Sequence, residues 1–192
     1  MKPILLTCML ITMALFTQAQ TSSAYFGVKA GLNIASLNVE NGVDFNAMAS
    51  AHVGGLVHVH VASHFAFQTE LFLSGQGGKD GGEKIKLLYM NVPLLLQFMA
   101  AEGFRFQTGP QLGVLLSAKD KEGNVEVDIK DNLKAVDFSW VFGLGYQFPG
   151  SELGIDARYN LGISNINDGS TTIQNRVFAV GLFYQFMHYR KH

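Results

Sequence analysis

The feature that most constrains this chain is the alternation of apolar and other residues, which recurs in eight segments after the N-terminal region. In one of them, the alternate residues between positions 136 and 148 are all apolar and none is charged. A period of two indicates β-strands, whereas an amphipathic helix would need a period of 3.6. The eight segments predicted as strands are 25–37, 49–61, 65–75, 85–99, 104–118, 135–148, 153–164 and 175–187.

Composition excludes several classes of protein. Only 15% of the 192 residues are charged, against about 25% in an ordinary globular protein. Beyond the N-terminal region no apolar run reaches the length of about 20 residues that a membrane helix requires. The net charge of −1 offers no electrostatic basis for binding nucleic acid.

The first residues have the pattern of a secretory signal peptide. A basic Met1-Lys2 start is followed by an apolar stretch from Ile4 to Phe16, and Thr17-Gln18-Ala19 forms a small-x-small cleavage site. The alternatives are an N-terminal membrane anchor and a lipoprotein signal at Cys8, which comes too early for a good match. We predict a signal peptide over 1–19 and one barrel domain over 20–192, which would contain no cysteine and hence no disulfide.

The connections between the segments alternate in length. Those after the second, fourth and sixth segments are short, and the others are longer and polar. An even number of strands with short turns at one end and long loops at the other is typical of an outer-membrane barrel with both termini in the periplasm. Because lipid cannot satisfy open sheet edges, we predict an all-β fold: an eight-stranded antiparallel up-and-down transmembrane β-barrel.

The same alternation would also fit a soluble barrel of lipocalin type with the apolar face inside. The interior of an eight-stranded barrel is just wide enough to be filled by side chains, and the many Phe residues of the apolar face would overfill it. The other face is rich in glycine, which suits a crowded lumen better than a water-facing surface. We therefore expect the apolar face to contact lipid and the glycine-rich face to line the lumen.

Charged residues on the predicted inner face are balanced in sign. An unpaired charge in a narrow lumen would carry a large desolvation cost, so we expect these side chains to pair. All but Asp137 fall near the periplasmic strand ends, which predicts an ion-paired plug that fills the lumen. This polar cluster comprises Lys29, Glu70, Arg105, Asp137, Asp156 and Arg158.

Other candidate sites are weaker. His52, His58 and His60 share the inner face of one strand and could bind a metal, but polar filling of the lumen is the simpler interpretation. The acids of the loop 119–134 could bind a divalent cation or merely be solvated, and the alternation within 125–129 predicts a short hairpin there. Ser63 and His64 are adjacent and expected to point apart, so no enzyme and no cofactor are predicted.

Two prolines interrupt predicted strands. Matching faces across the turn 100–103 places Phe98 opposite Phe104, and hence Val92 opposite Pro110 with Pro93 beside it. Proline has no backbone N–H to donate to a β-ladder, so we expect a bulge or lost pairing there.

Several strings resemble a known family. Tyr89–Leu96, Gly109–Leu116 and Arg158–Ile166 are similar to strand motifs of the PorT-like, or porin-family, outer-membrane barrels of the Bacteroidota. The resemblance extends from Tyr25 to Phe186 and implies the barrel fold without catalytic residues. Members commonly end at an aromatic residue of the last strand, whereas here Phe186 is followed by six residues that end in Arg190-Lys191-His192.

The predicted function is that of a structural or interaction protein in the cell outer membrane. The expected contact regions for an extracellular ligand or an envelope protein are the loops near 38–47, 76–84, 119–134 and 165–174. Other expected partners are outer-membrane lipid and the barrel-assembly machinery. The alternative, from the transport class, is a narrow pore for small solutes.

Overall fold

A computed structural model describes residues 24–40, 42, 44–123 and 125–189 of the chain. The predicted signal peptide, with Cys8, and the last three basic residues lie outside this range. Almost all of the described chain is β-strand. The strands are β1 (Ala24–Val39), β2 (Phe45–His60), β3 (Phe65–Asp80), β4 (Glu83–Met99), β5 (Phe104–Glu122), β6 (Val125–Asp128), β7 (Val136–Gln147), β8 (Leu153–Gly162) and β9 (Ile173–Tyr189).

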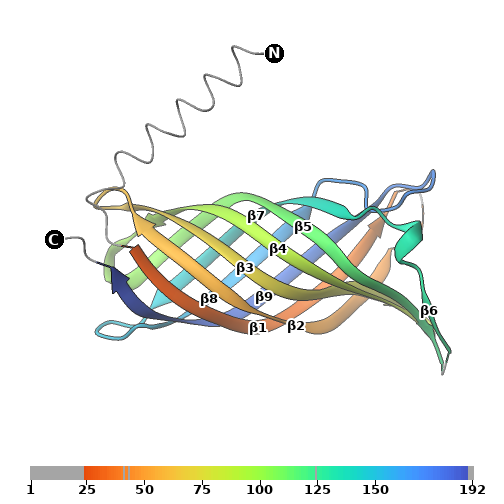
Figure 1. The fold of residues 1–192 in the computed structure, drawn as a ribbon, viewed down its shortest axis with the longest axis horizontal. Coiled ribbons are helices and arrows are strands. Elements are labelled where there is room, and N and C mark those ends of the chain that lie inside the picture. The colour runs from red at the N-terminus through yellow and green to blue at the C-terminus, as the bar shows by residue number, and fades with distance from the viewer. Residues whose placement is uncertain (1–23, 41, 43, 124, 190–192) are drawn as a thin grey trace, which may run out of the picture.

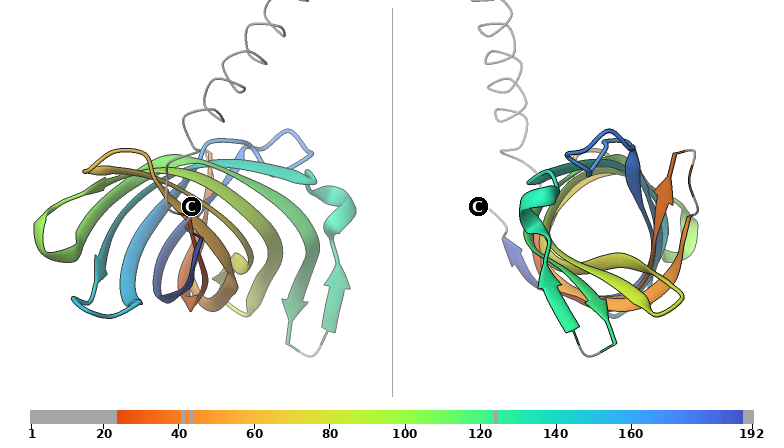
Figure 2. Two further views of the ribbon diagram at one scale, coloured as in Figure 1. Left: turned by 60° about the vertical axis from the view of Figure 1, so that its left-hand side comes forward. Right: turned by 90° about the vertical axis from the view of Figure 1, so that its right-hand side faces the viewer.

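Eight of these strands form a closed antiparallel barrel, as predicted. Each strand pairs with its neighbour along the chain, except that β5 pairs with β7, and β1 pairs with β9 to close the ring. The ring is visible in the right-hand view of Figure 2. Closure leaves the eight barrel strands without an open edge, which is the condition for a sheet to lie in lipid. No helical segment in the described residues is long and apolar enough to cross a membrane.

The two ends of the barrel differ. We call the end where β1 begins and β9 finishes the terminal end, and the opposite end the loop end (Figure 1). The terminal end carries the short turns β2–β3, β4–β5 and β7–β8, and the loop end carries the other connections. Short 3-10 helices, η2 (Ala101–Gly103) and η3 (Lys130–Asn132), lie in the β4–β5 and β6–β7 connections.

The apolar face lies outside, as expected. Leu32 and Phe106 are 68% and 53% exposed, while the inner-face Lys29 is only 5% exposed. A surface that exposes so many large apolar side chains in a row would be unfavourable in water. It matches the lipid-facing band of a membrane barrel, and the lipocalin-type alternative is thereby excluded.

The loop end differs from the sequence-based expectation. The segment 76–84, predicted to be a loop, continues the β3–β4 hairpin, with Asp80 opposite Glu83 across a two-residue turn. The prediction was wrong because Asp80-Gly81-Gly82 is a tight hairpin turn, in which Gly81 takes a φ of 53°. The predicted short hairpin was correct: β6 folds back on the end of β5, which it pairs from Lys119 to Glu122.

The prolines fall where the ladder is interrupted, but the predicted register was wrong. Phe98 pairs with Phe106 rather than Phe104, because the β4–β5 turn contains η2 with Glu102 at a φ of 62°. Backbone pairing between β4 and β5 is missing between the Pro93–Gln111 and Leu96–Thr108 pairs. Pairing was therefore lost near the prolines, as expected.

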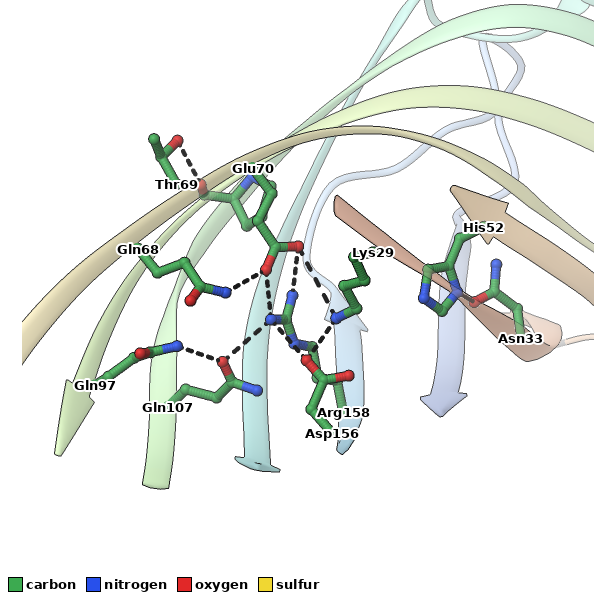
Figure 3. Close-up of polar contacts among 11 residues, drawn as sticks. Lys29, Asn33, His52, Gln68, Thr69, Glu70, Gln97, Gln107, Asp156 and Arg158 are labelled. Atoms are coloured by element: carbon green, nitrogen blue, oxygen red, sulfur yellow. Dashed lines mark hydrogen bonds and ion pairs between the residues drawn. The ribbon is translucent and has the colours of Figure 1, made fainter. Parts of the chain in front are cut away.

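A side chain compensates for part of a second gap, in the β3–β4 ladder, where Glu70 and Leu71 have no paired residue on β4. Thr69 Oγ1 on β3 donates a hydrogen bond of 3.1 Å to the carbonyl of Pro93 (Figure 3). A carbonyl without a partner inside a membrane would be costly. The threonine thus gives the Pro93 carbonyl a hydrogen-bond partner.

Strand β9 continues past the aromatic residue where the resembled family ends. It runs to Tyr189, and Tyr189 pairs with Ala24 of β1. The register shifts between Phe26 and Gly27, so the partner of Phe26 is Met187 and that of Gly27 is Gln185. Of the six residues that follow Phe186, the first three therefore belong to the barrel wall.

Candidate functional site: the filled lumen and its closed mouth

Four charged side chains from three strands meet in the lumen (Figure 3). Arg158 of β8 forms two hydrogen bonds with Glu70 of β3, at 2.7 Å from Nη1 and 2.5 Å from Nη2. Lys29 of β1 lies 2.6 Å from Asp156 of β8, and Asp156 lies 2.9 Å from Arg158. Two cations and two anions thus form one neutral network, which we call the lumen network.

Amide side chains extend the lumen network toward β4 and β5. Gln68 donates to Glu70 at 2.6 Å, Arg158 donates to Gln107 at 3.1 Å, and Gln97 donates to Gln107 at 3.0 Å. Hydrogen bonds to charged groups are the stronger ones, and a buried network is favourable only when its members are satisfied. These contacts tie β1, β3, β4, β5 and β8 together across the barrel interior.

The other two predicted members of the polar cluster lie apart from the lumen network. Arg105 donates to Gln147 at 2.6 Å, and its guanidinium lies 4.6 Å from the centre of the Phe183 ring. Asp137, near the loop end, accepts hydrogen bonds from Ser164 at 2.6 Å and from Asn175 at 2.9 Å. The six residues therefore form one four-membered network and two separate polar contacts.

Glycines on the inner face leave the space that these long side chains occupy. A Cβ atom at Gly143 would press on the stems of Arg158 and Gln107, and one at Gly145 would press on Arg105. At Gly54 the close contact is instead with the neighbouring strand β3, at Leu71 and Phe72. Because protein interiors are closely packed, Gly143 and Gly145 follow from the filled lumen, and Gly54 follows from the close approach of two strands.

We expect the substitution Gly54→Ala to destabilise the barrel by about 1–3 kcal/mol, because the neighbouring backbone of β3 cannot move aside easily. The matched control is Gly82→Ala, where the added methyl group would meet no atom within 4 Å. Urea titration of the refolded protein in detergent measures both variants. Equal midpoints for the two would contradict the close packing at Gly54.

The three histidines considered as metal ligands do not converge. His58 and His60 pack edge to face with ring centres 4.6 Å apart, whereas the Nδ1 atom of His52 lies 2.8 Å from Asn33 Oδ1. In the described part of the chain, no group of three or more His, Cys, Asp or Glu side chains is arranged to hold a metal ion. The histidines fill the lumen and contact neighbouring rings and amides.

Two acids of the 119–134 region, Glu126 and Asp128, face lysines in the β5–β6 hairpin. Lys121 pairs with Glu126 and Lys119 with Asp128. Lys119 Nζ lies 2.5 Å from Glu126 Oε1. This arrangement is an exposed ion-paired hairpin, and the divalent-cation alternative finds no support in it.

The adjacent Ser63 and His64 were expected to point apart, and this expectation was wrong. Ser63 Oγ lies 3.1 Å from His64 Nδ1 in the exposed β2–β3 turn. The His64 ring stacks on Phe98. Among the described residues no carboxylate hydrogen-bonds to this histidine, so the third group that orients the base of a catalytic triad is missing.

An apolar cluster closes the barrel at the loop end, and sequence reasoning did not predict it. Buried residues from β1, β4, β5 and the β8–β9 loop form its centre, and residues from the other loop-end segments pack against them. We call it the apolar cap. Its buried members are Leu37, Leu87, Tyr89, Leu115, Ala118 and Ile166, and those packed on them are Phe45, Ile85, Ile129, Leu133 and Ile173.

The loops are held over the apolar cap by backbone contacts. Leu133 and Asn167 form a β-bridge between the β6–β7 and β8–β9 connections. The N–H of Lys134 donates to the carbonyl of Ile166 at 2.8 Å. An apolar residue within an otherwise polar loop, such as Ile166, was the signal that could have revealed the cap.

Known proteins of the same fold are outer-membrane barrels. Neisserial surface protein A (NspA) is 14% identical, with 84% of this chain and 97% of that chain covered and a TM-score of 0.59. Ail, the attachment invasion locus protein of Yersinia pestis, is 14% identical, with 86% and 99% covered and a TM-score of 0.52. No curated protein sequence matches the chain significantly. At these identities the likeness concerns the fold.

A family model provides the direct assignment. The model described as outer membrane protein beta-barrel domain matches residues 18–168, which is more than half of the chain. The matched region includes most of the barrel strands and all four members of the lumen network. The chain therefore belongs to the outer membrane protein β-barrel domain family.

Proposed function

We propose that this protein is a non-conducting interaction protein of the outer membrane, with its loop end exposed outside the cell and both termini in the periplasm. The observation that carries this proposal is the double closure of the lumen. The lumen network crosses the interior, and the apolar cap covers the loop end. A pore needs a continuous water-filled path, which both layers obstruct.

The orientation is supported by the connections. Outer-membrane barrels carry short turns on the periplasmic side and longer loops outside, and the short turns of this barrel lie at the terminal end. The finer resemblance to PorT-like proteins of the Bacteroidota supports the same placement through its strand motifs. Neither the resemblance nor the lumen supplies a catalytic group, so we propose no enzymatic activity.

The loop end offers a surface with strand-paired hairpins for an extracellular ligand or an envelope protein. The β3–β4 and β5–β6 hairpins project there (Figure 2), and the β6–β7 and β8–β9 connections pack on the apolar cap. Partner binding by preformed hairpins would cost less ordering entropy than binding by unstructured loops.

Planar-bilayer recording tests this proposal against the narrow-pore alternative. We expect purified refolded protein to give no steady conductance above that of detergent alone. The variant Tyr89→Ala, which opens the apolar cap and leaves the lumen network intact, should remain silent as well. A reproducible unitary conductance from the unaltered protein would favour the pore.

A further inference from the structure

At the level of the apolar cap and beyond it, strands β3, β4 and β5 carry five lysines on one face. In the strand register Lys79 lies opposite Lys84, Lys84 lies opposite Lys121, and Lys86 lies opposite Lys119. Directly opposed residues of antiparallel strands point to the same side. We call this surface the lysine face.

Acidic residues occupy the opposite side of the same strands. Glu83 is paired with Asp80 on β3 and with Glu122 on β5. Partial burial and the neighbouring Asp120 and Glu122 raise the pKa of Glu83 above its usual value. The charges are therefore sorted by side of the sheet, and cross-strand pairs within β3–β5 do not neutralise the lysines.

Strand β6 places its carboxylates directly opposite Lys119 and Lys121, and Lys86 also lies near enough to Glu126 for an electrostatic interaction. Glu126 and Asp128 lie opposite Lys121 and Lys119, and the hydrogen bond from Lys119 lowers the pKa of Glu126. Within the described residues Lys79, Lys84 and Lys86 have no carboxylate within 4 Å. Like charges that face each other across strands are destabilising. An anion bound between these lysines would therefore stabilise this surface.

The lysine face continues the lipid-facing surface of the barrel. On β4, the exposed Lys84 and Lys86 share a side with Leu88, Val92 and the apolar residues below them. The lipid-facing band of such barrels ends at the interface with the headgroups. Lysine can lay its alkyl stem along apolar surface while its ammonium group reaches that interface.

We propose that the lysine face binds phosphorylated headgroups of the outer-leaflet lipid. Phosphate groups supply the missing negative charge, and the position of the face beside the lipid band favours a lipid over a soluble polyanion. The proposal rests on the orientation given above, in which the loop end meets the outer leaflet. It adds a lipid site that is separate from the apolar cap and the lumen.

Lysine acetylation footprinting in nanodiscs tests the contact. The probe is bis-phosphorylated lipid A mixed into phosphatidylcholine, compared with phosphatidylcholine alone. We expect acetylation of Lys84 and Lys86 to fall by about threefold or more when lipid A is present, since anionic headgroups concentrate near basic side chains. Acetylation of Lys130, which lies in η3 outside the lysine face, should not change. Because lipid A is in both leaflets, an inverted orientation would not affect this result.

The affinity of the protein for lipid A is the second measurement. Replacing both residues in K84Q/K86Q should weaken lipid A retention, measured by native mass spectrometry, by about thirtyfold, and K130Q should leave it unchanged. A heat-dependent gel shift checks that each variant is folded. Equal retention by K84Q/K86Q and the unaltered protein would overturn the proposal. So would equal protection of these lysines by soluble sucrose octasulfate in pure phosphatidylcholine, which would indicate a general polyanion site.

Discussion

Replacing Glu70 by Gln should destabilise the barrel by about 3–5 kcal/mol, because the change leaves buried charge without its partner. Arg158 would lose a two-bond ion pair, and Lys29 would lose the second of its two carboxylates, at 4.0 Å. Glutamine has nearly the same shape as glutamate, so no cavity contributes to the loss. The measurement is the free energy of unfolding from urea titration in detergent or lipid.

Two further variants separate burial of charge from loss of contact. The double variant E70Q/R158M removes one charge of each sign and keeps the Lys29–Asp156 pair, so it should be less destabilised than E70Q alone. E126Q breaks an ion pair at the exposed hairpin instead, and such pairs contribute little. If E70Q and E126Q unfold at the same urea concentration, the lumen network does not stabilise the barrel.

Truncating Tyr89 to alanine should also cost about 3–5 kcal/mol, the usual loss when a buried aromatic side chain is removed. Tyr89 has no exposed surface and lies at the centre of the apolar cap. The cavity would open beneath the β6–β7 and β8–β9 connections. We therefore expect both a lower free energy of unfolding and faster proteolysis of these two connections.

The control for the apolar cap is Val125→Ala at the same end of the barrel. Val125 is 64% exposed, and a truncation at such a surface position should change stability by less than about 0.5 kcal/mol. Unchanged proteolysis of the two connections in Y89A would show that they are held by something other than the cap.

The limits of sequence reasoning are clearest at the loop end. Segment 76–84 contains four glycines and several charges, which favoured a loop. The structure makes it a hairpin, because pairing with β4 outweighs the weak strand propensity of glycine. Ile166 and Leu133 come from loops far apart in sequence, and only their packing in the apolar cap makes them part of a core.

For the polar residues of the lumen, the sequence predicted the inner face but not the partners of each side chain. Alternation placed Lys29, Glu70, Asp156 and Arg158 on the inner face, and the desolvation cost of an unpaired ion predicted that they would pair. Which residues pair depends on the stagger of the strands, and a single turn such as η2 shifts that stagger. In the register of β5 and β7, Arg105 lies opposite Gly145, and its side chain contacts Gln147 and Phe183 instead of joining the lumen network.

The sequence by itself determined the fold class, the number of barrel strands and which face meets lipid, because these follow from a period of two and from the exclusion of charge from lipid. The tertiary structure decided the register, the partners in the lumen network, the apolar cap and the lysine face. These features depend on contacts between strands and loops distant in sequence, and an alternating pattern along one strand does not specify its offset against the next.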